Sequence, residues 1–89
     1  MKAIVTVVGR DTVGILAKVS AVCAEHNANI IDVSQSVMKE LFTMIMLVDI
    51  AKINSSFAEL QNALCELGDK IGMKIHVMHE DIFNSMHNI

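Results

Sequence analysis

The apolar and polar positions in the first third of the chain predict a strand followed by a helix. Residues 2–8 alternate and are rich in β-branched side chains, which favours a strand buried on at least one face. Apolar residues then recur at helical spacing over residues 15–23. We expect this helix to end near His26 and Asn27, because asparagine tolerates the left-handed backbone of a helix terminus.

The middle of the chain predicts two strands joined by a tight turn. Residues 30–38 alternate, and their two faces are Ile31, Val33 and Val37 against Asp32, Ser34 and Ser36. Lys39 and Glu40 form the expected turn, whose type stays open because they lack an Asn-Gly pair. Residues 41–50 predict a third strand that is apolar on both faces, with Phe42, Met44, Met46 and Val48 against Leu41, Ile45 and Leu47.

The last third of the chain predicts a helix, a strand and a tail. Ser56 and Glu59 fit a capping box. The apolar residues that follow lie on one stripe, which consists of Phe57, Leu60, Leu64, Leu67 and Ile71. Gly72 suits the position just past the helix, with Gly68 as an earlier alternative. Residues 73–80 predict a fourth strand. The tail, residues 81–89, carries apolar residues at the spacing of a short packed helix, namely Ile82, Phe83, Met86 and Ile89.

This order of elements predicts an α+β fold of the ferredoxin-like type. Two strand–helix–strand halves with right-handed crossovers give a four-stranded antiparallel sheet with two helices on one face. We expect one domain over residues 1–80, followed by the tail. Because many unrelated functions share this architecture, the fold alone says little about function.

The second apolar face of the third strand predicts self-association. A sheet with helices on one side is expected to turn polar side chains to water on the other. We therefore expect another subunit's sheet, or the tail, to cover this face, which implies a homodimer or a higher homo-oligomer. The alternative is an exposed apolar face, which folded proteins do tolerate.

Composition and charge narrow the function classes. The 89 residues carry a net charge of -3 without a cluster of basic residues, which argues against nucleic acid or an anionic membrane as partner. No apolar stretch approaches the ~20 residues of a membrane span, and nothing resembles a signal peptide, so we expect a cytoplasmic protein. Cys23 and Cys65 lack zinc or redox spacing and are expected to be small buried hydrophobes. The histidines show no metal-ligand spacing within one chain, so we expect no metal and no cofactor, although a metal site across subunits stays open.

The segment between the first strand and the first helix carries candidate binding chemistry. Amide groups at a helix start lack intrahelical partners and the helix dipole adds positive potential, so a carboxylate is a natural guest. Gly9 would allow a sharp turn, and Gly14 the close approach of a ligand. Asp11 would complement an ammonium group, so that one turn holds both ends of a free amino acid. Arg10, the only arginine, would strengthen the anion side or pair across a subunit boundary.

Plainer interpretations of the same residues exist. Asp11 or Thr12 would serve only as the helix cap, because a side-chain oxygen there accepts from exposed backbone N–H groups. Gly14 would be a packing glycine, and Arg10 a solvated surface charge. The spacing alone does not separate these interpretations from a binding site.

Two stretches of the chain resemble the ACT domain, the small-molecule-sensing module of many amino-acid metabolic enzymes and regulators. They are VGRDTVGILAKVS, at the first turn and helix, and EHNANIIDVSQ, which leads into the second strand. The strand order agrees throughout, so the resemblance covers essentially the whole chain. The tail HEDIFNSMHNI is similar to that of small free-standing bacterial proteins made of a single ACT domain.

The resemblance implies a ligand site where the first turn of one subunit meets the second strand of its neighbour. The matching positions are Arg10, Asp11, Thr12, Val13, Gly14, Ile15 and Leu16 from the turn and Asn29, Ile30, Ile31 and Asp32 from the neighbouring strand. ACT domains often carry proline where this chain has Val13, which lacks a fixed φ but keeps an N–H for a ligand. We expect no attached enzyme domain, which leaves a regulated protein target unidentified.

These features together predict a homodimeric sensor of a small molecule, an amino acid, without catalytic chemistry of its own. One alternative is an assembly module that binds only protein. Another is an acylphosphatase-like enzyme with a first-turn arginine as phosphate clamp, although this turn does not resemble that family's loop. An RNA-binding module of the same architecture would carry stacking aromatics on its central strands, whereas this chain has no Tyr or Trp.

Overall fold

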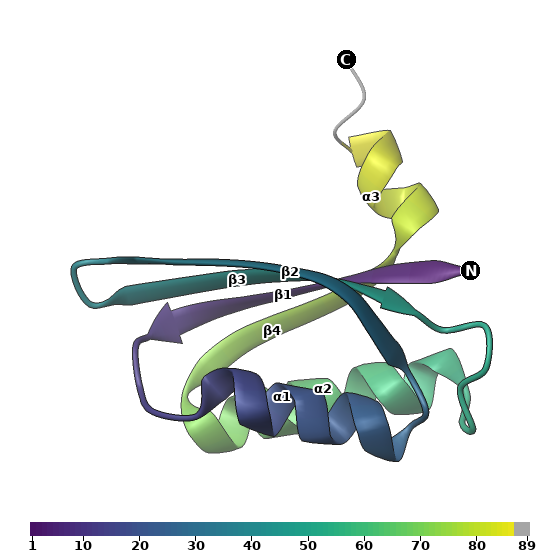
Figure 1. Ribbon diagram of the computed structural model, residues 1–89, viewed down its shortest axis with the longest axis horizontal. Coiled ribbons are helices and arrows are strands. Elements are labelled where there is room, and N and C mark those ends of the chain that lie inside the picture. The colour runs from purple at the N-terminus through teal and green to yellow at the C-terminus, as the bar shows by residue number, and fades with distance from the viewer. Residues whose placement is uncertain (87–89) are drawn as a thin grey trace.

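Within residues 1–86, which this computed structural model describes, four strands and three helices are present (Figure 1). In chain order they are β1 (Lys2–Arg10), α1 (Ile15–Glu25), β2 (Asn29–Met38), β3 (Leu41–Asp49), α2 (Phe57–Ile71), β4 (Met73–His79) and α3 (Glu80–Met86). The predicted α+β, ferredoxin-like arrangement is confirmed. The expected role of Ile89 in the tail lies outside the described residues.

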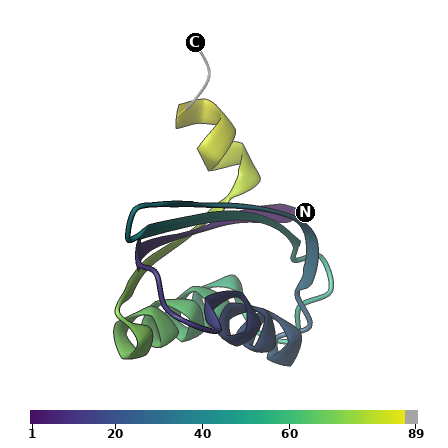
Figure 2. The same ribbon diagram turned by 60° about the vertical axis from the view of Figure 1, so that its left-hand side comes forward.

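The strands form one antiparallel sheet in the order β2-β3-β1-β4, so β1 and β3 are central and β2 and β4 are edges. Residues Met38 and Leu41 are paired, which leaves Lys39 and Glu40 as the predicted two-residue turn. Lys39 has φ +57°, the left-handed value that such a turn requires. Helices α1 and α2 lie side by side on one face of the sheet (Figure 2).

The core lies between the sheet and these two helices because alternate strand residues point toward them. The central strands supply Ala3, Val5, Val7, Phe42, Met44, Met46 and Val48, all buried. Helix α1 contributes Ile15, Val19 and Cys23, and α2 contributes Leu60 and Leu64, with Phe57, Leu67 and Ile71 packed partly against the core. The predicted stripe of α2 and the face of β3 that carries Phe42, Met44, Met46 and Val48 are therefore confirmed, whereas Leu16 in the predicted apolar spacing of α1 is exposed.

Both ends of α2 follow the predicted chemistry. The Ser56 hydroxyl accepts a hydrogen bond from the Glu59 backbone N–H at 3.1 Å. The Glu59 carboxylate accepts from that hydroxyl rather than from the Ser56 amide, so the capping box is half formed. Gly72 ends the helix with φ +74°, while Gly68 lies inside it.

A β-bulge at Ile31 corrects the predicted faces of β2. The register shifts between Ile30 and Asp32, so Ile31 is the extra residue, and Ile30 and Val33 pack on the core side. Simple alternation would have placed Ile31 beside Val33. Instead Ile31 is exposed at the outer edge of the sheet.

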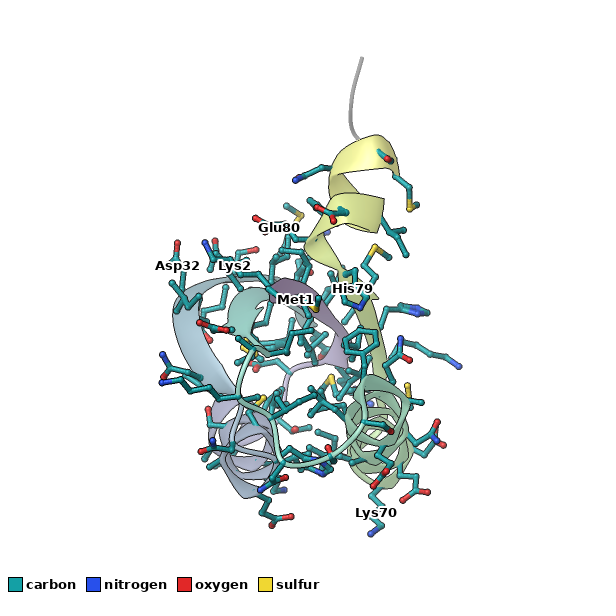
Figure 3. The ribbon with its side chains drawn as sticks, turned by 90° about the vertical axis from the view of Figure 1, so that its right-hand side faces the viewer. Met1, Lys2, Asp32, Lys70, His79 and Glu80 are labelled. Atoms are coloured by element: carbon teal, nitrogen blue, oxygen red, sulfur yellow. The ribbon has the colours of Figure 1, made fainter. Side chains whose placement is uncertain are left out.

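The side of the sheet opposite α1 and α2, called here the open face, is not covered by a second layer in the single chain. The register places on it Asp32, Ser34, Ser36, Met38, Leu41, Thr43, Ile45, Leu47, Ile4, Thr6, Val8, Lys74, His76 and Met78. Figure 3 shows Asp32 and the start of α3 at Glu80 on this side, and Lys70 beyond the helices. Helix α3 rises away from the open face (Figures 1 and 2).

The tail forms the helix α3, and its predicted packing stays a prediction. None of the residues 80–86 is buried in the single chain, and the side chains of Ile82 and Met86 are 54% and 67% exposed. The physical reason is that α3 stands on the sheet instead of lying along it, so its main contacts within residues 1–86 are with β1 and β4.

Replacement of Gly68 by alanine tests the packing of α2 on β4. An added Cβ would lie 2.7 Å from the Met73 carbonyl oxygen and 3.0 Å from Ile75 Cγ1. We expect Gly68→Ala to lower the free energy of unfolding by about 1–3 kcal/mol in urea denaturation, although alanine ordinarily favours a helix. The exposed Asn62→Ala in the same helix is the control and is expected to stay within about 0.5 kcal/mol. A stabilised Gly68→Ala variant would contradict this packing.

Candidate functional site

The first turn, residues 11–14, is tied to the turn of the β2–β3 hairpin. The Asp11 backbone N–H donates to the Glu40 carbonyl oxygen at 2.8 Å. The Arg10 guanidinium donates through Nη2 to Glu40 Oε2 at 3.3 Å, and both side chains are largely exposed. An ion pair of this kind contributes at most about 1 kcal/mol. Arg10 therefore has a partner within its own chain, and the hairpin fixes where the first turn begins.

Helix α1 starts without a side-chain cap, which corrects the prediction for Asp11 and Thr12. Gly14 is the N-cap residue, with φ +83°, and no side-chain hydrogen bond caps the helix. The Lys18 N–H makes the first intrahelical bond, to the Gly14 carbonyl oxygen at 3.0 Å. The amides of Ile15, Leu16 and Ala17 precede that bond, so they are the donors that a helix start leaves without intrahelical partners.

The role predicted for Gly9 is wrong, and Gly14 provides the left-handed turn that was predicted for Gly9. Gly9 lies within β1 rather than in a turn, and a Cβ there would sit 2.6 Å from Met73 Sδ and 2.9 Å from the Gly72 carbonyl oxygen. Gly9 therefore permits close packing against the start of β4. Gly14 provides the left-handed turn, and a Cβ there would meet only Lys18 Cε, at 3.9 Å. The space beside Gly14 is open.

The side chains around this helix start are available to a ligand. Asp11 and Thr12 are exposed, and Val13 is 94% exposed, which is unusual for an apolar residue. Leu16 is also exposed, whereas the side chain of Ile15 is buried in the core and offers only its backbone. The turn thus presents an acid, an apolar surface and backbone donors together.

The predicted strand half of the site, residues 29–32, lies at the other end of the sheet. Asn29 pairs with Asp49 at the end of β3, whereas the first turn lies beside the hairpin (Figure 1). Asn29, Ile31 and Asp32 are exposed, and the Asp32 carboxylate accepts from the Val33 N–H at 2.9 Å. Ile30 packs partly on the core. One chain therefore does not bring the two halves together.

A polar pocket that the sequence analysis did not predict lies beside the start of β2. It has a volume of about 380 Å³ and is lined by Asn27, Asn29, Asp49 and Lys52. Asn27 has φ +57°, and its amide donates to the Lys52 carbonyl oxygen at 2.8 Å. Only the left-handed tendency of Asn27 was readable from the sequence, because the other residues meet through the pairing of β2 with β3.

The two cysteines have different surroundings, so one of the two predictions for them is wrong. Cys23 is buried in the core, and this burial raises the pKa of its thiol to about 11. Cys65 is exposed, and its thiol donates to the Ile75 carbonyl oxygen at 3.4 Å. The prediction rested on the frequent burial of free cysteine. The residues three and four positions away are Gln61, Asn62, Gly68 and Asp69, so Cys65 lies off the apolar stripe of α2.

Within residues 1–86, no group of three or more His, Cys, Asp or Glu side chains is arranged to hold a metal ion. Over the same residues, no helix has both the length and the apolar character needed to cross a membrane.

Comparison with known proteins decides the family. The family model of the ACT domain matches residues 2–78. The chain belongs to the ACT domain family. A UPF0237 protein of Methanococcus maripaludis is 57% identical over 86 residues, which cover 97% of this chain and 96% of that protein. A UPF0237 protein of Listeria innocua is 47% identical over 89 residues, which cover all of both chains.

Solved structures agree with the fold of this ACT domain. An ACT domain protein from Streptococcus pneumoniae superposes with a TM-score of 0.81 and 42% identity, and the match covers 93% of each chain. The regulatory subunit of aspartate kinase from Thermus thermophilus, in a ligand-free form, superposes with a TM-score of 0.69 and 24% identity. That match covers 89% of this chain and 51% of the other, and it shows the fold alone.

Substitutions at the start of α1 test whether the helix start depends on the left-handed backbone of Gly14 or on a capping side chain of Thr12. We expect Gly14→Ala to lower the free energy of unfolding by about 1–2 kcal/mol in urea denaturation, because alanine is strained at positive φ. Gly14→Asn is expected to cost less, since asparagine visits this region. Thr12→Ala, the control, is expected to stay within about 0.5 kcal/mol because Thr12 does not cap the helix. A fall of about 1 kcal/mol in the free energy of unfolding of Thr12→Ala would show that Thr12 does cap the helix.

Proposed function

We propose that this ACT domain is a cytoplasmic, homodimeric regulatory protein that binds a small amino acid and performs no chemistry of its own. The observation that carries the proposal is the start of α1. Its first-turn amides have no side-chain cap, and Asp11, whose side chain is exposed, belongs to the turn that leads into the helix. Those amides suit the carboxylate of an amino acid, and Asp11 suits its ammonium group.

The edge strand β2 supports a dimer in which the site becomes complete. It has ten residues, contains no Lys or Pro, and carries one charge, Asp32. A long edge of this kind is suited to pairing with another strand. If β2 pairs antiparallel with its copy over its whole length, residue 29 of one chain comes opposite residue 38 of the other. The partner's residues 29–32 then lie beside the hairpin end, where the first turn is.

Exposed apolar side chains follow the same seam. Ile31 and Val37 lie on the edge strand, and Val13 and Leu16 lie at the start of α1. Covering them would remove apolar surface from water, at about 25 cal/mol per Å². The partner's Asn29 and Asp32 would add polar groups to a ligand held by the α1 amides.

Related proteins support a regulatory role. One solved structure of this fold is the regulatory subunit of an aspartate kinase, so at least one protein with the same fold regulates an enzyme of amino-acid chemistry. By analogy, ligand binding would stabilise the dimer, and it would shift the equilibrium of a protein target only as far as the affinities of the two states differ. That protein target is part of the proposal and has no identity yet.

Two other functions use the same surfaces. An assembly module would bind protein through β2 and the first turn without a small ligand. An acylphosphatase-like enzyme would need Arg10 for a phosphate, but Arg10 is paired with Glu40. We therefore place the enzyme below the other two.

A thermal-shift screen of the full chain against the twenty amino acids tests the proposal. A ligand that binds only the folded protein adds about 2.7 kcal/mol at 100 times its Kd, so at least one amino acid is expected to raise the Tm by several degrees. Asp11→Ala is expected to abolish that shift. Asp69→Ala, an exposed acid on α2, is the matched control and is expected to keep it.

The outcomes of the screen separate the candidate functions. No shift with any amino acid, for a folded wild-type protein, would contradict amino-acid sensing and leave the assembly module. A shift that survives Asp11→Ala would place the ligand elsewhere. Turnover of an acyl phosphate that is lost in Arg10→Ala would support the enzyme instead.

A further inference from the structure

We propose that α2 closes the β4 edge of the sheet to a second strand, and that this closure leaves β2 as the edge through which copies of the chain pair. The second half of this statement rests on the β2 pairing of the proposed function, whereas the closure itself belongs to the single chain. The side chains responsible are Gln61 and Cys65 of α2, which lie outside the candidate ligand site.

The backbone register shows which groups of β4 point outward. The Asp11 N–H donates to the Glu40 carbonyl oxygen, which continues the β1–β3 ladder with odd-numbered residues of β1. Successive residues of an antiparallel strand form their hydrogen bonds on opposite sides, so the even-numbered residues of β1 bond to β4. Their partners are residues 74, 76 and 78. The N–H and C=O groups of Ile75 and Val77 therefore point outward, away from β1.

Two side chains of α2 bond to these outward carbonyl groups. Gln61 Nε2 donates to the Val77 carbonyl oxygen at 2.8 Å, in a half-buried contact. The Cys65 thiol donates to the Ile75 carbonyl oxygen at 3.4 Å. A second strand that paired with β4 would need both oxygens as acceptors. It would therefore have to displace both side chains.

The spacing of residues lets α2 follow the β4 edge. Phe57 lies one turn before Gln61, and its ring centroid is 4.4 Å from that of His79, two residues beyond Val77 (Figure 3). From one contact to the next, the helix advances four residues, or about 6 Å, and the strand two residues, or about 6.6 Å. At the far end, Gly68 lets α2 approach β4 closely, since an added Cβ would clash with the strand backbone. The contacts with β4 thus repeat along the helix.

The β2 edge has no cover of this kind. Strand β3 uses its even-numbered residues for β1, so its odd-numbered residues bond to residues 34, 36 and 38 of β2. Gln35 and Val37 therefore turn their backbone groups outward, and within residues 1–86 no side chain forms a hydrogen bond with them. Strand β2 also lacks lysine, whereas β4 carries Lys74, and an edge lysine hinders strand pairing.

A closed β4 edge limits how far the sheet can grow. Pairing between two copies of β2 joins two four-stranded sheets into one and leaves a β4 edge at each end. If β4 also paired with its own copy, each end would add further chains, and the sheet would extend without closing. With β4 closed, edge pairing stops at two chains. Gln61 and Cys65 would then determine where the assembled sheet ends.

Sedimentation equilibrium of the full chain over a range of micromolar concentrations tests the closure. Gln61→Ala combined with Cys65→Ala removes both donors, adds no charge and keeps residues that favour a helix. We expect the mass of this double alanine variant to rise at least about two-fold over the wild type, because pairing of two β4 edges joins two wild-type assemblies. Circular dichroism and a cooperative melt verify the fold. If the double variant does not fold, Gln61→Ala alone is measured in the same way.

Two further double variants of α2 are the matched controls. Gln61→Lys with Cys65→Ser keeps a donor at each position. Asn62→Ala with Glu66→Ala removes two exposed side chains at the same spacing. Both are expected to keep the wild-type mass. A larger mass in the first would show that the donors do not close the edge, and in the second that the association does not depend on β4, so either result contradicts the proposal.

Hydrogen exchange locates the new contact. The outward amides of Ile75 and Val77 have no strand partner in the single chain and become hydrogen-bonded when β4 pairs with another strand. We expect their exchange to be slower in the double alanine variant than in the wild type at the same concentration. A larger mass without slower exchange at these amides would place the new contact elsewhere and contradict the closure.

The results for the closure and for the proposed dimer are independent. A folded double alanine variant that keeps the wild-type mass contradicts the closure, whatever the wild-type mass is. A monomeric wild type whose double alanine variant forms dimers through β4 supports the closure and contradicts pairing through β2.

Discussion

The two-residue period of a β-strand is the constraint on which the rest of this structure depends. Strands β1 and β3 bury Val5, Val7, Met44 and Met46 against the two helices, and these side chains are among the most deeply buried of the core. The same backbone then turns the alternate residues, Ile45 among them, to the opposite side. A single layer of helices covers one face only. Apolar residues on the other face therefore remain for a partner.

The same pairing positions the candidate ligand site. Because β1 is central and ends beside the hairpin, the Asp11 amide bonds to Glu40, and the first turn is held at one end of the sheet. Helix α1 then crosses back to the edge, where β2 begins at the opposite end. The two halves of the site thus lie far apart in one chain, and an antiparallel copy of β2 would place them together. Ligand binding at this composite site would therefore require self-association.

The elements and the core could be predicted from the sequence because they follow the regular spacing of apolar residues along the chain. The capping serine of α2, the left-handed Gly72 and the two-faced β3 are local signals of this kind. The features that the apolar pattern did not predict depend on contacts between segments that are distant in the sequence. Position 9 requires glycine because Met73, which is far away in the sequence, packs closely against it. The bulge at Ile31 likewise depends on the pairing of β2 with β3.

The measurement that tests the central claim most directly is amide chemical-shift mapping of the labelled protein during titration with each of the twenty amino acids. The account predicts that a binding amino acid shifts the amides of residues 14–17 and of residues 30–32 together, because the two segments meet in one site across the dimer. Shifts confined to the polar pocket of Asn27, Asn29, Asp49 and Lys52, or shifts at residues 14–17 alone, would contradict a composite site at the start of α1.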